Sequence, residues 1–207
     1  MYVDDLPSCS SFKTVLHTDD TYFGLSHKTV HVLKDFVNSE LANVAKWMRL
    51  NKLSINYSKS VYMLTRSMKY LCSPTELTSF TVHINNVLLQ GTACVKYLGA
   101  LINSRLDWSS HVQLITRKRL YACNMLFNLS KFVPIDILRL LNFSFVHCHL
   151  KYCVISWGTA NNSVLQPLSV LQINILRIMT FSKYRCLIIA LYKNLKILKL
   201  NDIYQFE

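Results

Sequence analysis

The first 107 residues combine short apolar runs with turns, and they predict strands around one long helix. β-Branched and aromatic residues at 14–17 and 21–23 flank Asp19-Asp20, which predicts a strand, a tight turn and a second strand. Over residues 28–50, apolar residues recur every three or four positions, which is the spacing of an amphipathic helix. The residues of this apolar stripe are Val30, Leu33, Val37, Leu41, Val44 and Met48.

More strands are expected after this helix. A hairpin over Phe80–Leu89 turns at Asn85-Asn86, because two asparagines between apolar runs are typical of a tight turn. A polar loop near Ser73–Thr78 precedes that hairpin. Further short strands are expected over Leu53–Asn56, Val61–Thr65 and Val95–Ile102.

After Trp108 the apolar positions take a helical period. Helices are expected over 109–131, 134–152, 163–181 and 186–199. The second helix has an apolar stripe at Leu138, Leu141, Phe145, Cys148 and Tyr152. The third has one at Val164, Leu168, Leu171, Ile175 and Ile178. The sequence therefore predicts an α+β fold, with an α+β part over residues 1–107 and an all-helical part over residues 108–207.

The composition allows a packed core. Hydrophobic residues make up 51% of the 207 residues, which argues against disorder, and four glycines and four prolines are too few for a turn-rich β sandwich. The net charge of +12 is uneven, since residues 1–40 carry six acids and three bases whereas residues 41–207 carry five acids and twenty bases. A basic body behind an acidic head suits a polyanionic partner and a bound cation, or it is only a solvated basic surface.

The cysteines and the apolar stretches indicate the compartment. Seven cysteines at irregular spacing, mostly in apolar surroundings, are typical of free thiols in a reducing environment, and no signal peptide opens the sequence. The most apolar stretch, Phe132–Trp157, is interrupted by charged residues and lacks the roughly 18–20 apolar residues of a membrane span. We expect an intracellular protein, cytoplasmic or nuclear, without a membrane partner.

Asp19-Asp20, at the tip of the expected hairpin, is the feature that points most directly to chemistry. Phosphoryl transfer through two divalent cations needs converging carboxylates, and Mg²⁺ prefers hard oxygen ligands. A tight turn can hold two adjacent carboxylates at the end of a sheet, within reach of a nucleotide triphosphate. Adjacent aspartates in turns are also common as solvated turn formers, so the pair alone does not decide its role.

The surrounding residues supply a context for this pair. Leu16–Thr21 resembles the reverse-transcriptase signature of an aromatic residue, a small residue and Asp-Asp, followed by Thr or Ser in LINE-type (non-LTR) retrotransposon enzymes. The opening Tyr2–Pro7 is similar to the Tyr-Ile-Asn-Asp-Leu-Pro that precedes the catalytic hairpin in that family. Further matches follow in the order of the family: Leu41, Val44 and Trp47; 51–56; Lys59-Ser60; 62–64; 96–99 with Ile102; Leu106, Trp108 and His111; Leu171-Gln172; 176–178; Leu195; Ile197-Leu198; and Asp202-Ile203. The ordered set covers essentially the whole chain, and it resembles the end of the palm plus the thumb of such a polymerase.

The resemblance implies that Asp19 binds Mg²⁺, with Asp20 as its companion in the palm. Lys59 would lie near the incoming triphosphate, where it would assist proton transfer to the leaving pyrophosphate. Two positions depart from the family, because His17 stands in place of the usual Phe or Tyr and Thr18 in place of Ala or Val. These departures indicate relaxed selection or a divergent copy.

The resemblance also implies where nucleic acid binds. Lys96, Tyr97 and Gly99 would lie in the primer-grip hairpin, where glycine permits close backbone approach. The later helices would form the thumb, which holds an RNA or DNA template–primer duplex through its backbone. On the first of these helices, consecutive residues of the basic triplet 117–119 fan out by about 100° each, so the three cannot face one groove. Which of them point outward stays open; Arg117 and Lys118 are our candidates for phosphate contact, and a solvated face is the alternative.

Three other groups suggest sites but are interpreted as structural. Tyr2–Asp5 spells the retroviral Asp-Asp box, yet Leu-Pro-Ser after it leaves no second strand, so we prefer Asp19-Asp20. A second group looks like metal ligands, but no paired Cys-x-x-Cys spacing supports zinc and Cys148 belongs to the apolar stripe, so we expect a packed helix. Its members are His147, Cys148, His149 and Cys153. The third group, interpreted as core anchors rather than base-stacking platforms, is Trp47, Trp108 and Trp157.

The sequence thus predicts a truncated domain of a reverse transcriptase. Nothing before Met1 supplies the fingers or the strand with the other metal-binding aspartate, so we expect the chain to be inactive alone. In the full-length parent, the reaction would be Mg²⁺-dependent transfer of a nucleotidyl group to a primer 3′ hydroxyl. Whether the chain itself is an enzyme stays open. The alternative is a non-catalytic nucleic-acid-binding module that retains the duplex grip of the thumb.

Overall fold

The computed structural model describes residues 3–18, 20–65 and 80–207, and the chain divides into two compact units. Unit 1 is Met1–Ala93 and unit 2 is Cys94–Glu207. Unit 1 combines one long helix with short strands, and unit 2 combines one hairpin with a set of helices, so a mixed α+β fold is confirmed. The division falls before the boundary predicted near residue 107, because the hairpin that opens unit 2 packs with the helix that follows it.

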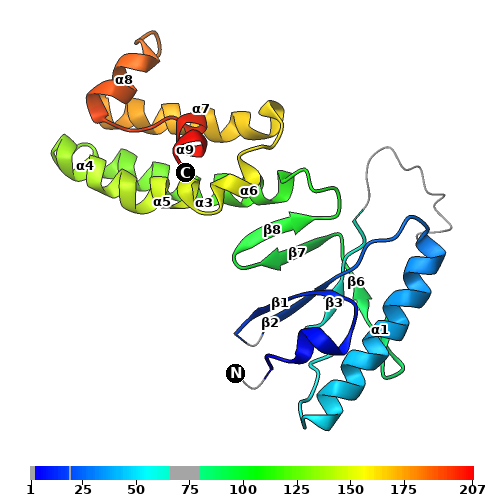
Figure 1. Ribbon diagram of the computed structural model, residues 1–207. Coiled ribbons are helices and arrows are strands. Elements are labelled where there is room, and N and C mark those ends of the chain that lie inside the picture. The colour runs from blue at the N-terminus through cyan, green and yellow to red at the C-terminus, as the bar shows by residue number, and fades with distance from the viewer. Residues whose placement is uncertain (1–2, 19, 66–79) are drawn as a thin grey trace. The chain divides into compact units, whose positions relative to one another are not determined.

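Unit 1 begins with a short helix and a hairpin (Figure 1). The 3₁₀ helix η1 (Leu6–Cys9) precedes β1 (Lys13–His17) and β2 (Asp20–Gly24), which pair antiparallel with His17 opposite Asp20. Alternate residues of β1 are exposed and half-buried, as expected for a strand with one face on a core. The strand–turn–strand pattern predicted here is confirmed.

The helix α1 (Val30–Leu50) covers the core of unit 1 with the predicted stripe. Leu41 and Val44 are buried, and the other stripe residues are half-buried and pack on the same core. Asn38 fastens α1 to the next hairpin, because its side-chain oxygen accepts a hydrogen bond from the amide of His83 at 2.8 Å. The long helix is therefore confirmed by both its length and its buried face.

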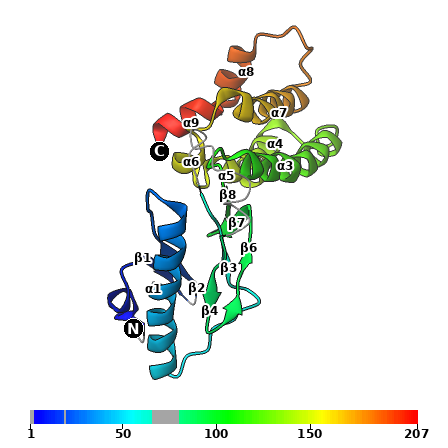
Figure 2. The same cartoon turned by 90° about the vertical axis from the view of Figure 1, so that its right-hand side faces the viewer.

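The second hairpin joins β4 (His83–Ile84) and β5 (Val87–Leu88) and lies beside α1 (Figure 2). Asn85 and Asn86 form its turn with φ of 50° and 63°. Asparagine tolerates this left-handed backbone better than most residues, because its short polar side chain bonds locally. The hairpin predicted over Phe80–Leu89 is confirmed.

The other strands of unit 1 differ from prediction. β3 (Val61–Tyr62) pairs in parallel with β6 (Gln90–Gly91), so the strand predicted over Val61–Thr65 is shorter than expected. No strand forms over Leu53–Asn56, which takes no regular structure between a turn at 51–52 and a turn at 57–59. The loop predicted near Ser73–Thr78 lies outside the described residues.

The strands of unit 1 form three separate two-stranded sheets within the described residues. One small apolar cluster joins them to α1. Its buried members are Leu6, Phe12, Leu41, Val44, Ala45, Phe80, Val82, Ile84 and Leu89. The positions with the lowest exposure therefore come from α1, from the segment before β1 and from the residues on either side of the β4–β5 hairpin.

Unit 2 opens with a hairpin where the alternation predicts a single strand over Val95–Ile102. β7 (Cys94–Tyr97) and β8 (Ala100–Asn103) pair antiparallel. Leu98 and Gly99 turn the chain with φ of 43° and 85°. The single-strand prediction is wrong, because a leucine in the first turn position hides the turn within an apolar run.

The helices α3 (Ser109–Leu129) and α7 (Asn162–Thr180) lie side by side and supply much of the core of unit 2 (Figure 1). Both are confirmed as predicted, with ends that differ by at most two residues. In α7, the stripe residues that are buried are Leu168, Leu171 and Ile175. These helices hold the site described below in place.

The helix predicted over 134–152 contains a π turn. It consists of α4 (Ile135–Asn142), the π-helical η2 (Phe143–His147) and α5 (Cys148–Lys151). A π turn closes i→i+5 hydrogen bonds and takes up more residues than an α turn, so the inward face shifts along the sequence. The predicted stripe is therefore wrong beyond its first turns, and three of its members are exposed: Phe145, Cys148 and Tyr152. The buried positions are Leu138, Asn142, Val146, Leu150 and Val154.

Three short helices complete the described part of unit 2. They are α6 (Val154–Trp157), α8 (Ile188–Leu195) and α9 (Leu200–Phe206). The single helix predicted over 186–199 is wrong, because Lys196 takes a φ of 51° and ends α8. The residue after it is buried, so the apolar pattern continues although the helix does not.

The three tryptophans pack into the cores, as predicted. Trp157 is fully buried, and its indole N–H donates a hydrogen bond to the carbonyl of Tyr152 at 2.9 Å. Trp108 packs on the same cluster, and Trp47 packs on the cluster of unit 1. Each ring is therefore engaged with its own core.

Candidate nucleic-acid interface

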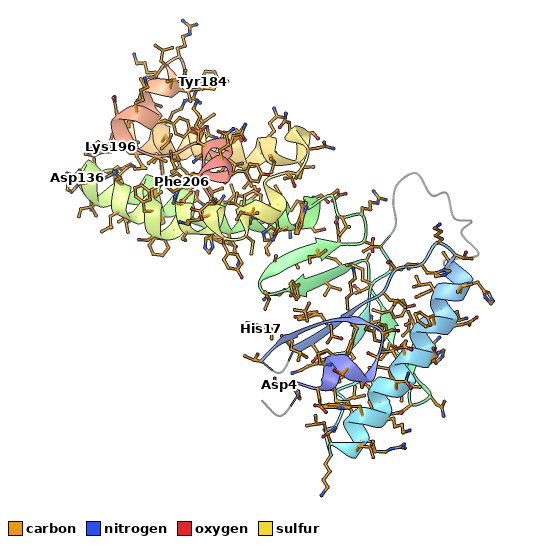
Figure 3. The ribbon with its side chains drawn as sticks, in the orientation of Figure 1. Asp4, His17, Asp136, Tyr184, Lys196 and Phe206 are labelled. Carbon is orange, nitrogen blue, oxygen red and sulfur yellow. The ribbon has the colours of Figure 1, made fainter. Side chains whose placement is uncertain are left out.

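The hairpin of β1 and β2 carries the predicted carboxylates at its tip. Asp19 lies outside the described residues, and Asp20 is the exposed first residue of β2. His17 pairs with it at the end of β1 (Figure 3). Thr18 follows with a φ of 52°, in left-handed backbone that belongs to the turn. The hairpin thus presents the side chain of Asp20 to solvent at the end of a two-stranded sheet.

The competing Asp4-Asp5 pair is not on a hairpin. The carboxylate of Asp5 accepts a hydrogen bond from the indole of Trp47 at 3.2 Å. The 3₁₀ helix η1 follows directly, in place of a second strand. The local structure thus agrees that no second strand follows Asp4-Asp5, and the choice of Asp19-Asp20 as the catalytic pair stays a prediction.

Lys59 is exposed in a tight turn organised by Asn56. The amide of Lys59 donates to the carbonyl and to the side-chain oxygen of Asn56, each at 3.2 Å. Within the described ranges, no group of three or more His, Cys, Asp or Glu is placed to hold a metal ion. Magnesium binding by Asp19 and Asp20, and the catalytic part of Lys59, therefore stay predictions.

The β7–β8 hairpin is fastened to the helices of unit 2 at two points. The amide of Leu101 donates a hydrogen bond to Nδ1 of His111 at 3.2 Å. The hydroxyl of Tyr152 donates one to the carbonyl of Leu98. Gly99 completes the turn, and its φ of 85° would strain any residue with a Cβ. The turn, α3 and the end of α5 are thus held together.

The predicted nucleic-acid-binding residues divide into exposed and buried ones. Lys96 is exposed on β7, whereas Tyr97 is half-buried. The helix α3 presents Arg117 and Lys118 to solvent and buries Arg119, of which 1% is exposed. This answers the question left open by the sequence, because the buried face of α3 depends on the helices that pack against it.

A pocket of about 50 Å³ lies where the hairpin turn, α3 and the end of α5 meet. It is lined by Gly99, His111, Leu114, Ile115, Lys118, His149 and Tyr152. The structure therefore brings together two of the predicted nucleic-acid-binding residues, Gly99 and Lys118. Sequence reasoning placed Tyr152 in the core, and only the π turn in the preceding helix brings it to this pocket.

The imidazole of His111 is neutral and has one unused hydrogen-bond donor. Its Nδ1 accepts the Leu101 amide, so the ring proton lies on Nε2. That Nε2 is buried without a hydrogen-bond partner in the described chain. Burial, and then the nearby ammonium of Lys118, lower the pKa of His111. For His149, burial and then the charges of Arg119 and Lys118 lower the pKa.

Arg119 is a buried charge next to this region. None of its three guanidinium nitrogens has a hydrogen-bond partner within residues 3–18, 20–65 and 80–207. Burial lowers its pKa to about 9, which still leaves it charged at neutral pH. A buried charge without a partner is costly, so we expect Arg119 to destabilise the helical unit that contains it.

The residues weighed as metal ligands do not form a metal centre within the described chain. Cys148 is exposed, and its thiol donates to the carbonyl of Ser144 at 2.7 Å, so its predicted place in the apolar stripe is wrong. His149 lines the pocket instead. Free thiols are confirmed at Cys9, Cys123, Cys148, Cys153 and Cys186, and Cys72 lies outside the described residues.

Comparisons with known proteins add no relative to this picture. No protein-family model, curated protein or solved structure matches the chain. In the part of the chain that the structure describes, no helix has both the length and the apolar character needed to cross a membrane. The interpretation of the site therefore depends on its own residues and on the motifs of the sequence.

Proposed function

We propose that this chain is the end of the palm and the thumb of a LINE-type RNA-directed DNA polymerase, and that unit 2 binds an RNA or DNA template–primer duplex. The ordered motifs of the sequence support the family. The observation that carries the binding role is the hairpin turn at Gly99, which lines one pocket with Lys118 of α3, while Arg117 is a second exposed cation on the same helix. Such cations suit the sugar–phosphate backbone, where contacts position a protein without reading sequence.

The distribution of charge supports the same assignment. Residues 94–207 carry fourteen Lys and Arg against four Asp and Glu, whereas residues 1–93 carry nine against seven. The positive excess thus belongs mainly to unit 2. Neutralising backbone phosphates releases condensed counterions, so binding through such a surface should be tolerant of sequence and sensitive to salt.

Binding is tested by fluorescence anisotropy of a labelled RNA–DNA duplex with the full chain at several salt concentrations. The affinity should fall steeply between roughly 50 and 200 mM salt. The double variant Arg117→Gln/Lys118→Gln should bind more weakly, and the slope of log K against log salt should shrink by about 2, since each lost phosphate contact removes about 0.9. The double variant Lys183→Gln/Lys193→Gln removes the same charge from exposed positions elsewhere in unit 2.

Equal losses in the two double variants would contradict a defined interface on α3, and an affinity that ignores salt would contradict duplex binding through phosphates. Primer extension separates the two versions of the proposal. Template-dependent extension that Asp20→Asn removes would assign the chain the polymerase reaction, with Mg²⁺ supplied in the assay. Binding without extension would support the alternative, a non-catalytic module that holds the duplex but does not extend the primer.

A further inference from the structure

The segment that joins α7 to α8 exposes large apolar side chains in close succession. Phe181, Tyr184 and Leu187 are 69%, 83% and 77% exposed, and Ile189 in the first turn of α8 is 58% exposed. Single exposed apolar residues are ordinary on a protein surface, but four within nine residues are not scattered singly. We call residues 181–189 the projecting turn, because they lie at the outer end of the helices of unit 2 in both views (Figures 1 and 2).

Hydrogen bonds hold the projecting turn in one conformation. Nη2 of Arg177 donates to the carbonyl of Tyr184 at 2.9 Å, and the guanidinium lies over the ring of Tyr184, 4.6 Å from its centroid. The amide of Cys186 donates to the carbonyl of Lys183 at 3.0 Å. Phe181 ends α7 in left-handed backbone with a φ of 51°. A built turn therefore holds these side chains away from the core, with Tyr184 at its outer end (Figure 3).

The charge around the projecting turn has one sign. Residues 177–199 contain six Lys and Arg and no Asp or Glu. Five of the six are exposed: Lys183, Arg185, Lys193, Lys196 and Lys199. A surface with this charge attracts an anionic partner and repels a cationic one.

The apolar side chains distinguish between the classes of anionic partner. Nucleic-acid bases stack on aromatic rings, and Leu187 and Ile189 have none. Aliphatic side chains gain by leaving water for hydrocarbon. A lipid interface takes up projecting apolar side chains at the acyl boundary, while neighbouring Lys and Arg stay at the anionic headgroups. The combination in the projecting turn therefore favours an anionic lipid surface.

We propose that the projecting turn binds the surface of a bilayer that contains anionic lipids, with Phe181, Leu187 and Ile189 at the acyl boundary and Lys183 and Arg185 at the headgroups. The cytoplasmic leaflet carries such lipids, in agreement with the predicted intracellular location. Surface binding needs no spanning helix, and the described residues contain none. The expectation of no membrane partner considered spans only, and surface binding replaces that part of it. Lipid binding by this turn does not depend on the proposed duplex binding.

The test is sedimentation of the full chain with mixed phosphatidylserine–phosphatidylcholine vesicles and with vesicles of phosphatidylcholine alone. Binding to the mixed vesicles should be at least about tenfold stronger, because each Lys or Arg near an anionic surface contributes about fivefold. Lys183→Gln/Arg185→Gln should therefore weaken binding to the mixed vesicles about 30-fold. The matched control Arg117→Gln/Lys118→Gln removes the same charge from exposed positions of α3 and should cost much less.

Apolar variants test insertion separately from charge. Leu187→Gln/Ile189→Gln should weaken binding to the mixed vesicles at least about tenfold, because two side chains no longer leave water. Phe132→Gln/Leu140→Gln changes residues that are 83% and 61% exposed elsewhere in unit 2 and should leave the binding unchanged. In vesicles with brominated acyl chains, the added indole of Leu187→Trp should be quenched, whereas that of Leu140→Trp should not.

The outcomes separate lipid binding from duplex binding. A chain that does not bind the mixed vesicles would overturn the lipid proposal, favour a protein partner for the turn and leave duplex binding intact. Equal losses in the two apolar pairs, or an unquenched indole in Leu187→Trp, would also overturn it, since adhesion would then be general. A duplex affinity that falls as far in Lys183→Gln/Arg185→Gln as in Arg117→Gln/Lys118→Gln would assign the turn to nucleic acid instead.

Discussion

The helices of unit 2 pack around one large cluster of buried side chains, whereas the described strands of unit 1 stand in three separate pairs beside α1. A helix satisfies its own backbone along its length, but each strand of a two-stranded sheet is an edge with unpaired backbone groups. An isolated pair of strands is only marginally stable, so unit 1 depends on α1 and its small core. The difference teaches that regular patterns of equal clarity in a sequence can belong to regions with buried cores of unequal size.

The two units also differ in how they use charge. Unit 1 is close to balanced, with nine basic and seven acidic residues, whereas unit 2 has fourteen against four. Most of the charged side chains of unit 2 are exposed, but Arg119 lies inside the same helical unit. The unit with the larger buried cluster therefore also contains a buried guanidinium that has no hydrogen-bond partner in the described residues.

The largest expected effect is a contrast in hydrogen exchange. Amides in the middle of α3 and α7 should exchange at least about 100-fold more slowly than those of β1 and β2, because opening the hairpin exposes little apolar surface. Mass spectrometry of the full chain after timed exchange measures this. Uniformly slow exchange over residues 12–65 in a monomeric sample would show that unit 1 is as stable as unit 2. That result would contradict the expected difference in stability between the two units.

A smaller effect is expected from replacing the buried charge. Arg119→Met should stabilise unit 2 by about 1–4 kcal/mol, because it fills similar space without a buried charge. Urea unfolding, followed by the fluorescence of Trp108 and Trp157 in a Trp47→Phe background, reports unit 2. Arg117→Met, at an exposed position, should change the stability by less than about 0.5 kcal/mol.

A loss of stability in Arg119→Met would show that the guanidinium makes interactions that outweigh its burial. Hydrogen exchange in the same variant adds a second criterion. Protection should rise in α3 and α7 and stay unchanged in β1 and β2, since the two sets of amides belong to different units. A rise in both would mean that the units unfold together.

The smallest expected effect is acid sensitivity of unit 2. Burial is the main cause that lowers the pKa of His111, His147 and His149. Because the folded pKa of each histidine lies below the ordinary value near 6.5, the unfolded state binds more protons than the folded state at any pH between these two values. The contribution of these neutral histidines to the stability of the folded state is therefore fully present above pH 6.5. It is lost as the pH falls through the folded pKa.

Between pH 7 and pH 5 the contribution of the less exposed His111 and His147 to this loss should be on the order of 1 kcal/mol, and the exposed His149 adds little because water screens its charge interactions. The same tryptophan fluorescence, measured at a series of pH values, gives the slope. The variant His147→Asn removes one of the titrating groups and should flatten it. A stability of unit 2 that rises on acidification would reverse the sign and show that a protonated histidine gains a partner in the folded state.

Local turn chemistry explains why one hairpin was predictable and the other was not. The pair Asn85-Asn86 predicts a turn, because asparagine tolerates a positive φ. The turn at Leu98-Gly99 carries only one such residue, and the leucine continues the apolar run on both sides. The pattern of apolar residues therefore continues across this turn and predicts one strand. The resemblance to a primer-grip segment implied a hairpin at this place where periodicity alone predicted a strand.

The pocket shows the same limit for the candidate site. Lys118 and Gly99 were singled out as nucleic-acid-binding residues, but nothing in their spacing connects them to Tyr152 or His149. The π turn of η2 changes the direction in which Tyr152 points. Tyr152 therefore lines the pocket with Lys118 and Gly99 instead of lying in the core. A π turn takes up more residues than an α turn, so it shifts the facing of every later position of the helix, and the α-helical period used for the prediction does not include such a shift.

By itself the sequence determined the hairpins of β1–β2 and β4–β5, the long amphipathic helices and the basic bias of residues 94–207, because these depend on residues close together in the chain. Only the tertiary structure decided that Arg119 is buried while Arg117 and Lys118 are exposed. Three consecutive basic residues have the same local preferences. Which of them loses water is settled by the helices that pack against α3, and those come from residues far along the chain.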